Sequence, residues 1–346
     1  MVIIVTLKDI AKEANVSVMT VSNVIHKRKA KVSEKTEKKI LEIIKKYNYT
    51  PNMSARSLVN NSSKLIAFIL YQNRKDERNL FENPFNTEVL AGVDEVLKEN
   101  DYYLLVQSVS TLEEIYLIIK TWRAAGVIIL GILPNEVSHL KGNIDTPVVL
   151  IDTIIPNEAG SIYTVGIDDR DGFRIATEHL IANGHRDIGF VSYSRILGGV
   201  DEQRYLGYVD VLEAHGIEII DDRIFRYNKD EMNMDEFCNE IAKKKNLITG
   251  LVFTADFLAI EVMNSLRSKG ITIPDEISVV GFDNLSISKF VTPKLTTVHQ
   301  DITTKGKEAA NILLEVFKEN ESDRSGIKLP VQLVERESVK NIEFEK

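Results

Sequence analysis

Cysteine and long apolar runs are both scarce in this chain of 346 residues. Cys238 is the single cysteine, which excludes a disulfide framework and a cysteine-rich metal site. No apolar run approaches the about 18 residues of a membrane span, and the run over residues 2–5 is far too short for the core of a signal peptide. We therefore expect a soluble cytoplasmic protein with no membrane partner, no metal site and no cofactor.

Recognisable catalytic motifs are missing as well. The sequence contains no P-loop, GxGxxG fingerprint, Ser-His-Asp arrangement or metal-ligand spacing. His179 and His185 lie six residues apart, too far for two side chains on one helix face to chelate an ion together. These absences favour a binding protein over an enzyme.

The charge of the chain is divided unevenly. Residues 1–64 contain 13 Lys and Arg against 5 Asp and Glu, a net charge of +8, whereas the remainder carries −16. A basic segment on an acidic body is typical of a part that meets nucleic-acid phosphate joined to a part that does not. A solvated, lysine-rich helix would explain the same charge without any partner.

The basic segment carries the pattern of a helix-turn-helix, although a generic three-helix scaffold is the alternative. Thr6 can cap a first helix that ends at Asn15, a residue that tolerates the left-handed backbone of a tight turn. Ser17 can cap a second helix, and a third helix begins after Ser33. The apolar spacing predicts a buried side on each of these two helices: Val21, Val24 and Ile25 on the second, and Ile40, Leu41, Ile43, Ile44 and Tyr47 on the third.

The second helix is nearly free of charge although cations are dense around it. Those cations can neutralise phosphates: Lys8, Lys12, Lys27, Arg28, Lys29, Lys31 and Lys35. The side chains expected to look outward from the helix are Val18, Met19, Ser22 and Asn23. Short neutral side chains can contact base edges in the major groove, so we expect Asn23 to pair with an adenine and Asn23→Ala to cost about 1–3 kcal/mol at one base pair. Val18 and Met19 can offer apolar contact to a thymine methyl group.

The stretch after Pro51 contains one brief helical turn, from Ser54 to Leu58. A helix this short does not hold its structure alone in water. It is expected to order against DNA or a second copy of the chain; a plain linker is the alternative.

The acidic body alternates apolar strands with helical patterns. The strands are expected at residues 65–71, 102–107, 126–133, 147–152, 188–193, 250–254 and 277–282, and the helices near 86–99, 111–124, 171–183, 201–215, 235–245, 256–269 and 301–319. Continuous apolar strands that alternate with helices indicate parallel sheets covered on both faces. This number of strands predicts two α/β lobes with a ligand between them at the strand carboxyl ends.

Charged residues follow several of these strands. Asp152 and Asp283 each end a strand, Asp256 follows another, and Arg204 lies early in a helix. Carboxylates and a guanidinium that converge would suit a polyol, whose hydroxyls donate to Asp and accept from Arg. A carboxylate pair would also permit general acid–base chemistry, the alternative interpretation.

In this order the motifs "TLKDIAKEANVSVMTVSNVIH", "YNYTPNMSARSL", "NPF", "VVLID", "TEHLIANGHRDIGFV", "IPDEISVVGFDN" and "LTTVHQD" resemble the lactose-repressor (LacI) family of bacterial transcription regulators. The resemblance spans essentially the whole chain. It implies a repressor that binds a palindromic operator in double-stranded DNA as a homodimer, associated with the nucleoid and controlled by a small molecule, in this case a carbohydrate. The tail after Gly326 has a strand-like run but no leucine heptads, which favours a dimer over a tetramer.

The resemblance also implies a domain plan. An all-α helix-turn-helix head over residues 1–50 is joined by a hinge helix and linker (51–64) to a core like that of periplasmic sugar-binding proteins. The first core lobe is expected at 65–163 and 296–324, and the second at 164–295 and 325–346.

Site residues are carried over from the same resemblance. Leu58 matches the hinge leucine that wedges into the minor groove. The expected DNA-binding set is Thr6, Ser17, Val18, Met19, Thr20, Ser22, Asn23, Ala55, Arg56 and Leu58. The expected effector-binding set is Phe85, Asp152, Arg204, Asp256 and Asp283, with Ala255 where the family often has asparagine. A sugar-binding module or a sugar-acting enzyme that binds no operator remains the alternative.

Overall fold

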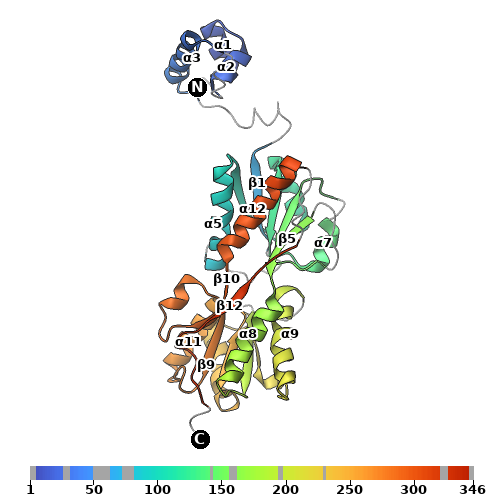
Figure 1. Ribbon diagram of the computed structural model, residues 1–346, viewed down its shortest axis with the longest axis vertical. Coiled ribbons are helices and arrows are strands. Elements are labelled where there is room, and N and C mark those ends of the chain that lie inside the picture. The colour runs from blue at the N-terminus through green and yellow to red at the C-terminus, as the bar shows by residue number, and fades with distance from the viewer. Residues whose placement is uncertain are drawn as a thin grey trace. The chain divides into compact units, whose positions relative to one another are not determined.

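The computed structural model describes residues 5–25, 32–49, 63–71, 82–140, 143–155, 162–193, 198–228, 231–319 and 326–342. The chain divides into two compact units, Met1–Ser63 and Lys64–Lys346, which are taken in turn below (Figure 1). Ala55, Arg56 and Leu58, the expected hinge residues, lie outside the described ranges.

The first unit contains the three expected helices, α1 (Leu7–Ala14), α2 (Val18–Ile25) and α3 (Glu34–Lys46). Thr6 caps α1 through a reciprocal box with Asp9, and Asn15 ends the helix in the left-handed conformation with φ 59°. Ser17 Oγ accepts a hydrogen bond of 3.1 Å from the Thr20 amide at the start of α2. The capping residues and the turn at Asn15 therefore start and end α1 and start α2 at the predicted positions.

Two apolar positions of α3 differ from the prediction. Leu41 is 49% exposed and Tyr47 is 40% exposed, whereas Ile40 and Ile43 are buried against α1 and α2. Leu41 lies about 100° around the helix from Ile40, outside the stripe that meets the other helices. Tyr47 is the residue that ends α3, past its last packed turn.

The second unit contains two six-stranded sheets, each of which forms one lobe. The first sheet has the order β11-β5-β4-β3-β1-β2 and the second β12-β10-β9-β8-β6-β7. Within the described residues, every strand pairing is parallel except that of β10 with β12. The first sheet is made of β1 (Leu65–Tyr71), β2 (Tyr103–Val109), β3 (Gly126–Leu130), β4 (Val148–Ile151), β5 (Ile162–Ile167) and β11 (Ile327–Leu329). The second is made of β6 (Ile188–Tyr193), β7 (Ile224–Tyr227), β8 (Gly250–Phe253), β9 (Ser278–Asp283), β10 (Thr296–Gln300) and β12 (Val331–Val334).

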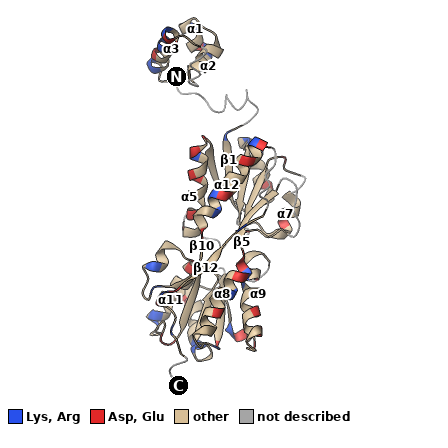
Figure 2. Cartoon of the chain, in the orientation of Figure 1, with Lys and Arg blue, Asp and Glu red and all other residues tan. Residues whose placement is uncertain are grey.

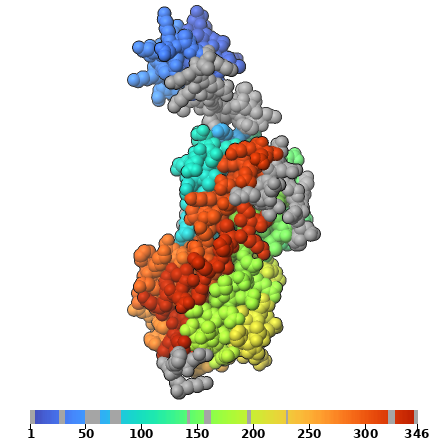
Figure 3. All heavy atoms as spheres, viewed as in Figure 1, coloured from blue at the N-terminus to red at the C-terminus, as the bar shows by residue number. Residues whose placement is uncertain are grey.

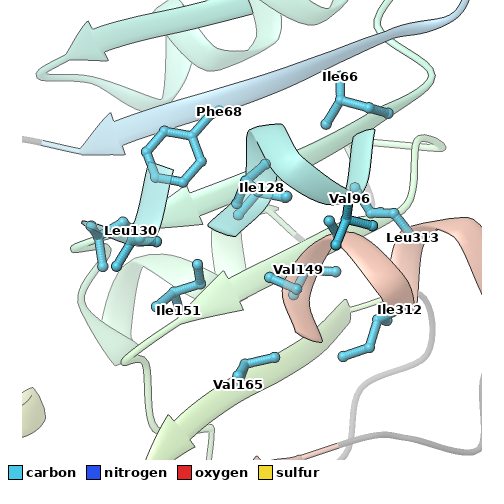
Figure 4. Packing of buried hydrophobic residues seen from close by; sticks show 14 of the residues in the cluster. Ile66, Phe68, Val96, Ile128, Leu130, Val149, Ile151, Val165, Ile312 and Leu313 are labelled. Atoms are coloured by element: carbon cyan, nitrogen blue, oxygen red, sulfur yellow. The ribbon is translucent and has the colours of Figure 1, made fainter. Parts of the chain in front are cut away.

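Helices cover both faces of each sheet. On the first sheet, α5 (Pro84–Glu99) and α12 (Ile302–Glu319) cover one face, and α6 (Leu112–Trp122) and α7 (Pro134–Leu140) the other. On the second, α8 (Asp169–Ala182) and α9 (Gly199–Ala214) lie opposite α10 (Met234–Lys243) and α11 (Asp256–Ser268). Within the described residues lie three short 3-10 helices: η2 (Asp221–Arg223), η3 (Lys245–Leu247) and η4 (Ser286–Lys289). In the first core, strand side chains interdigitate with those of α5 and α12 (Figure 4).

The crossing of α5 and α12 depends on two glycines. A Cβ at Gly92 would lie 2.1 Å from the Thr303 carbonyl oxygen, and one at Gly306 would lie 2.1 Å from that of Val89. Only glycine lets the two backbones approach this closely. The contact fixes α12, which begins at the junction of the lobes, against the first sheet.

The chain passes between the sheets three times, at positions that differ from the expected lobe boundaries. All of β5 belongs to the first sheet and all of β10 to the second, so these crossovers fall after 167 and after 300. The strand-like run after Gly326 is two strands: Pro330 separates β11 from β12, which lies in the other sheet. Proline lacks the amide hydrogen and suits such a break at a sheet edge, where no ladder bond from residue 330 is needed. In Figure 3 this C-terminal segment, in dark red, runs over the surface of both lobes.

Both sheets share one topology. In each, the second strand along the chain lies outside the first and the later strands add on the other side, as in β2-β1-β3-β4-β5. Such an order creates a switch point at the strand carboxyl ends, where α/β proteins bind ligands. Within the described ranges, no helix is both long and apolar enough to cross a bilayer.

Candidate functional site

The first unit presents an uncharged helix among cations. α2 has the sequence VMTVSNVI, and its Val18 and Met19 side chains are exposed, Met19 by 67%. The Ser17 and Thr20 hydroxyls lie 2.9 Å apart at the start of the helix. Thr6 lies at the corresponding end of α1, where its hydroxyl donates to Asp9. Both helix starts therefore offer hydroxyls and amides that suit phosphate oxygens.

Positive charge lies on the flanking helices. α3 carries Lys35, Lys38, Lys39, Lys45 and Lys46, and Figure 2 colours the basic residues of this helix blue. Two are engaged within the unit, since Lys39 donates to the Ala14 carbonyl oxygen at 2.9 Å and Lys46 to Glu13 at 2.7 Å. Lys8, Lys12 and Lys35 are exposed. A neutral apolar helix between such cations is the arrangement that can enter a groove lined by phosphates.

Asn23 does not lie where the sequence pattern predicted it. The expected outward side chain is only 8% exposed, and Ser22 is half-buried. A helical wheel places Asn23 beside Met19. Such a wheel compares positions on one helix and takes no account of other parts of the chain that cover it. Met19 and Val18 are therefore the open side chains of α2, and the expected adenine contact of Asn23 is not available in this conformation.

In the second unit, three of the five predicted effector residues, Phe85, Asp152 and Asp283, lie around a lysine that the sequence pattern did not indicate. Lys305, in the first turn of α12, has a fully buried side chain. Its Nζ donates to Asp152 Oδ1 at 2.6 Å and to Gln300 Oε1 at 2.5 Å. Gln300 Nε2 in turn donates to Asp283 Oδ1 at 2.6 Å. One continuous chain of polar contacts thus joins Asp152 of the first lobe to Asp283 of the second.

Phe85 belongs to the same group. It is the second residue of α5, behind the Asn83 cap, and it is half-buried against the first core. Lys305 Nζ lies 5.3 Å from the centre of its ring, a cation–π contact. Phe85, Asp152 and Asp283 are thus brought together, as predicted.

Arg204 lies in a second ion pair beside this chain. Its Nε and Nη2 both lie 2.8 Å from Asp169 Oδ1, and its Nη1 donates to the Thr254 carbonyl oxygen. The guanidinium carbon lies 4.1 Å from the centre of the Phe282 ring. Arg204 is therefore held on three sides by the protein and has little surface left for a ligand.

Asp256 is the predicted effector residue that the structure does not place at an accessible position. It is 0% exposed, and its carboxylate accepts from the Leu285 amide at 2.8 Å and from the Thr297 hydroxyl at 2.5 Å. A Cβ at Gly281 would lie 2.2 Å from Asp256 Oδ1, so glycine makes room for this carboxylate. Because one oxygen holds Leu285 in the loop after β9 and the other holds Thr297 in β10, Asp256 is a structural residue here, and the expectation that it faces a ligand is wrong for this conformation.

Burial dominates the electrostatics of the carboxylates. It raises the pKa of Asp283 to about 7, although Arg204 and the Gln300 amide act in the opposite direction. It likewise raises the pKa of Asp169 to about 6, against the attraction of Arg204. Burial and the neighbouring Asp283 hold the pKa of Asp256 well above its usual range. Arg204 and Lys305 therefore do not fully offset the cost of burying these negative charges where the two lobes meet.

Lys305, Gln300 and Asp169 are the residues that sequence reasoning missed. A signal for Lys305 existed, because it lies in the buried stripe of α12 with Ile302 and Ala309, where a lysine is unusual. Gln300 and Asp169 gave no such signal, since Gln300 ends β10 and Asp169 follows β5, two strands that were not predicted. Among the described residues, no group of three or more His, Cys, Asp and Glu is arranged to hold a metal ion.

Comparisons with known proteins agree with both units. Residues 6–52 match the family described as "Bacterial regulatory proteins, lacI family", and residues 177–339 match a "Periplasmic binding protein-like domain". Two relatives described as "HTH-type transcriptional repressor PurR" cover 97% of the chain and 99% of their own length. They come from Pasteurella multocida (strain Pm70), 30% identical, and Glaesserella parasuis serovar 5 (strain SH0165), 31% identical.

Solved structures share the fold across nearly the whole chain. A lac repressor dimer bound to operator and the anti-inducer ONPF has a TM-score of 0.83 at 24% identity, with 97% of this chain and 99% of that one covered. A complex of the transcriptional regulator CelR with cellobiose has a TM-score of 0.70 at 23% identity, with 96% and 99% covered. The predicted fold class, a helix-turn-helix head with a two-lobed periplasmic-binding-protein-like core, is confirmed. The chain belongs to the lacI family of bacterial regulatory proteins and is a DNA-binding transcriptional repressor, not an enzyme.

Proposed function

We propose that this repressor binds a palindromic operator as a homodimer in the bacterial cytoplasm, at the nucleoid, and that a sugar bound around Lys305 controls it. The observation that carries the proposal is the polar chain from Asp152 to Asp283. It ties acceptor groups of both lobes together, so a ligand that engages them acts on the angle between the lobes. A shift in lobe angle is the kind of two-state change that couples a ligand to a distant surface.

The DNA side of the proposal rests on α2. Met19 and Val18 would contact bases, and Thr6, Ser17, Thr20 and Ser22 would lie nearer the phosphates. Asn23 would join them only after a rearrangement that exposes it. Ala55, Arg56 and Leu58 remain candidates for the hinge contact through the family resemblance alone.

The proposal of a sugar effector depends on the hydrogen-bond acceptors around Lys305. Asp152 and Asp283 offer carboxylate oxygens to hydroxyl donors, and the half-buried Phe85 offers an apolar face of the kind that packs on a sugar ring. Among proteins of this fold, the CelR structure holds cellobiose, and a LacI family regulator from Enterococcus faecium holds ribose. The lac repressor structure on its operator is a dimer, the state proposed for this chain.

Two measurements test the proposal. Selection of bound duplexes from a random pool should return a palindrome, whose affinity falls steeply with salt because phosphate contacts release counterions. A thermal-shift screen of sugars should find one that raises the melting temperature, since a ligand that binds only the folded state stabilises it. Bound duplexes without a common sequence would contradict the DNA side, and the absence of any stabilising sugar would contradict the effector side.

A further inference from the structure

The cations at the junction of the lobes are already engaged. Lys305 is 0% exposed and donates to two partners, and Arg204 is held by Asp169, the Thr254 carbonyl and the Phe282 ring. A phosphate or carboxylate group of a ligand needs a cation or several free amides. Neither of these two cations is free to take that role.

Above the pKa of Asp283, about 7, the group of ionic residues also has a negative balance. Three carboxylates, Asp152, Asp169 and Asp283, face two cations, Lys305 and Arg204. Charges from four elements meet here: the end of β4, the start of α8, the end of β9 and the first turn of α12, with Arg204 on α9 behind them. An anion that enters such a group is repelled, whereas a hydroxyl that donates a hydrogen bond is accepted.

Lys305 supplies the positive charge that pairs with Asp152 in this group. Without it, Asp152 would end β4 with no cation, and the amide of Gln300 would lose the contact that holds it toward Asp283. Its position is fixed from behind, because α12 is packed on α5 through Gly92 and Gly306. The ammonium group of Lys305 is therefore a permanent part of the site. It is already paired within the protein, so it does not serve as the partner of a ligand anion.

We propose that Lys305 is a built-in counter-ion that closes the effector site to anions, so that the site selects unphosphorylated, hydroxyl-bearing ligands. The proposal rests on the proposed function, in which the same site binds the effector. Lys305 acts through Asp152 and Gln300 and is a positioning residue that sets specificity. A phosphorylated sugar would have to displace Asp152 from the ammonium group before it could bind.

The test removes the carboxylate partner of Lys305 and leaves its ammonium group in place. Asp152→Asn keeps the size of the side chain and tolerates the backbone φ of 57° at this position, but it leaves Lys305 without its carboxylate. Asp145→Asn is the matched control, because Asp145 is an exposed carboxylate three residues before β4. Thermal unfolding of the full chain is followed with inorganic phosphate, and with chloride at equal ionic strength.

Phosphate is expected to raise the melting temperature of Asp152→Asn by about 2–4 °C. The wild type and Asp145→Asn should respond alike and by less than a degree, since they share the basic head and any phosphate it binds. An equal rise in all three proteins would overturn the proposal, as would no rise in Asp152→Asn. If Asp152→Asn fails to fold, Asp283→Asn is measured at pH 8, where the Asp283 carboxyl is ionised in the wild type; it raises the charge of the same group from the other lobe and should show the same rise. Operator binding is measured separately, so a failure of the proposed function is distinguished from a failure of this inference.

Discussion

Replacement of Lys305 by methionine tests the buried ion pair most severely. Lys305→Met keeps a long side chain in the core but removes the ammonium group, which leaves Asp152 and Gln300 without their shared donor. Breaking a buried pair by removing one partner typically costs about 3–5 kcal/mol, because a charge stays buried without compensation. In a unit of this size each kcal/mol lowers the melting temperature by about 2–4 °C, so a decrease on the order of 10 °C is expected.

The loss should depend on pH. Lys305 also acts to lower the pKa of the buried Asp283, so its removal lets burial raise that pKa further, and the folded protein then holds a proton that the unfolded chain has released. A carboxyl with a raised folded-state pKa loses stability as the pH rises through the interval between its unfolded and folded values. The decrease in melting temperature is therefore larger at pH 8 than at pH 5.

Circular dichroism of the full chain during heating measures both effects. Lys307→Met is the matched control, since Lys307 lies on the same helix in a partly exposed pair with Glu95, and such pairs contribute less than about 1 kcal/mol. The double variant Lys305→Met with Asp152→Asn should recover much of the loss, because it removes the uncompensated charge. A loss no larger than that of Lys307→Met, or one that is equal at both pH values, would refute the reasoning.

Two further predictions concern the other lobe and the head. The pKa of Asp283, about 7, means that stability falls as the pH rises from about 4 to 7. In phosphate-free buffer, Asp283→Asn should therefore raise the free energy of unfolding more at pH 8 than at pH 5, by roughly 2–3 kcal/mol, and an equal change at both pH values would contradict this. Met19→Ala should relax base preference at one operator position by about 1–3 kcal/mol while leaving the salt dependence of binding unchanged. A uniform loss across operator variants would assign Met19 a positioning role only.

Elements whose signal is local could be predicted from the sequence. β1 and β6 begin and end at the predicted residues, because each is a continuous apolar run. The caps at Thr6, Ser17 and Ser33 were also predicted, since a cap depends on residues within one turn. The same holds for Asn15, where a single side chain decides whether the turn is possible.

Elements whose burial depends on residues far away in the sequence could not be predicted. β5 and β10 are mixed runs, IYTVGI and TTVHQ, that are buried only because strands and helices far away in the sequence cover them. Asp256 was predicted to face a ligand because it follows a strand, and only the structure shows that Leu285 and Thr297 occupy its oxygens. The partners of Lys305 lie 153 and 5 residues away, on different lobes, so no spacing in the sequence could have revealed the pair.

Equilibrium binding of the full chain to duplex DNA tests the central claim most directly. The selected palindrome and a scrambled duplex of equal length are compared, with and without the sugar that stabilises the protein. An uncharged α2 that contacts bases predicts a preference for the palindrome of at least about 1,000-fold, and a change in that preference when the sugar is added. Equal affinity for both duplexes, unaltered by the sugar, would contradict the account.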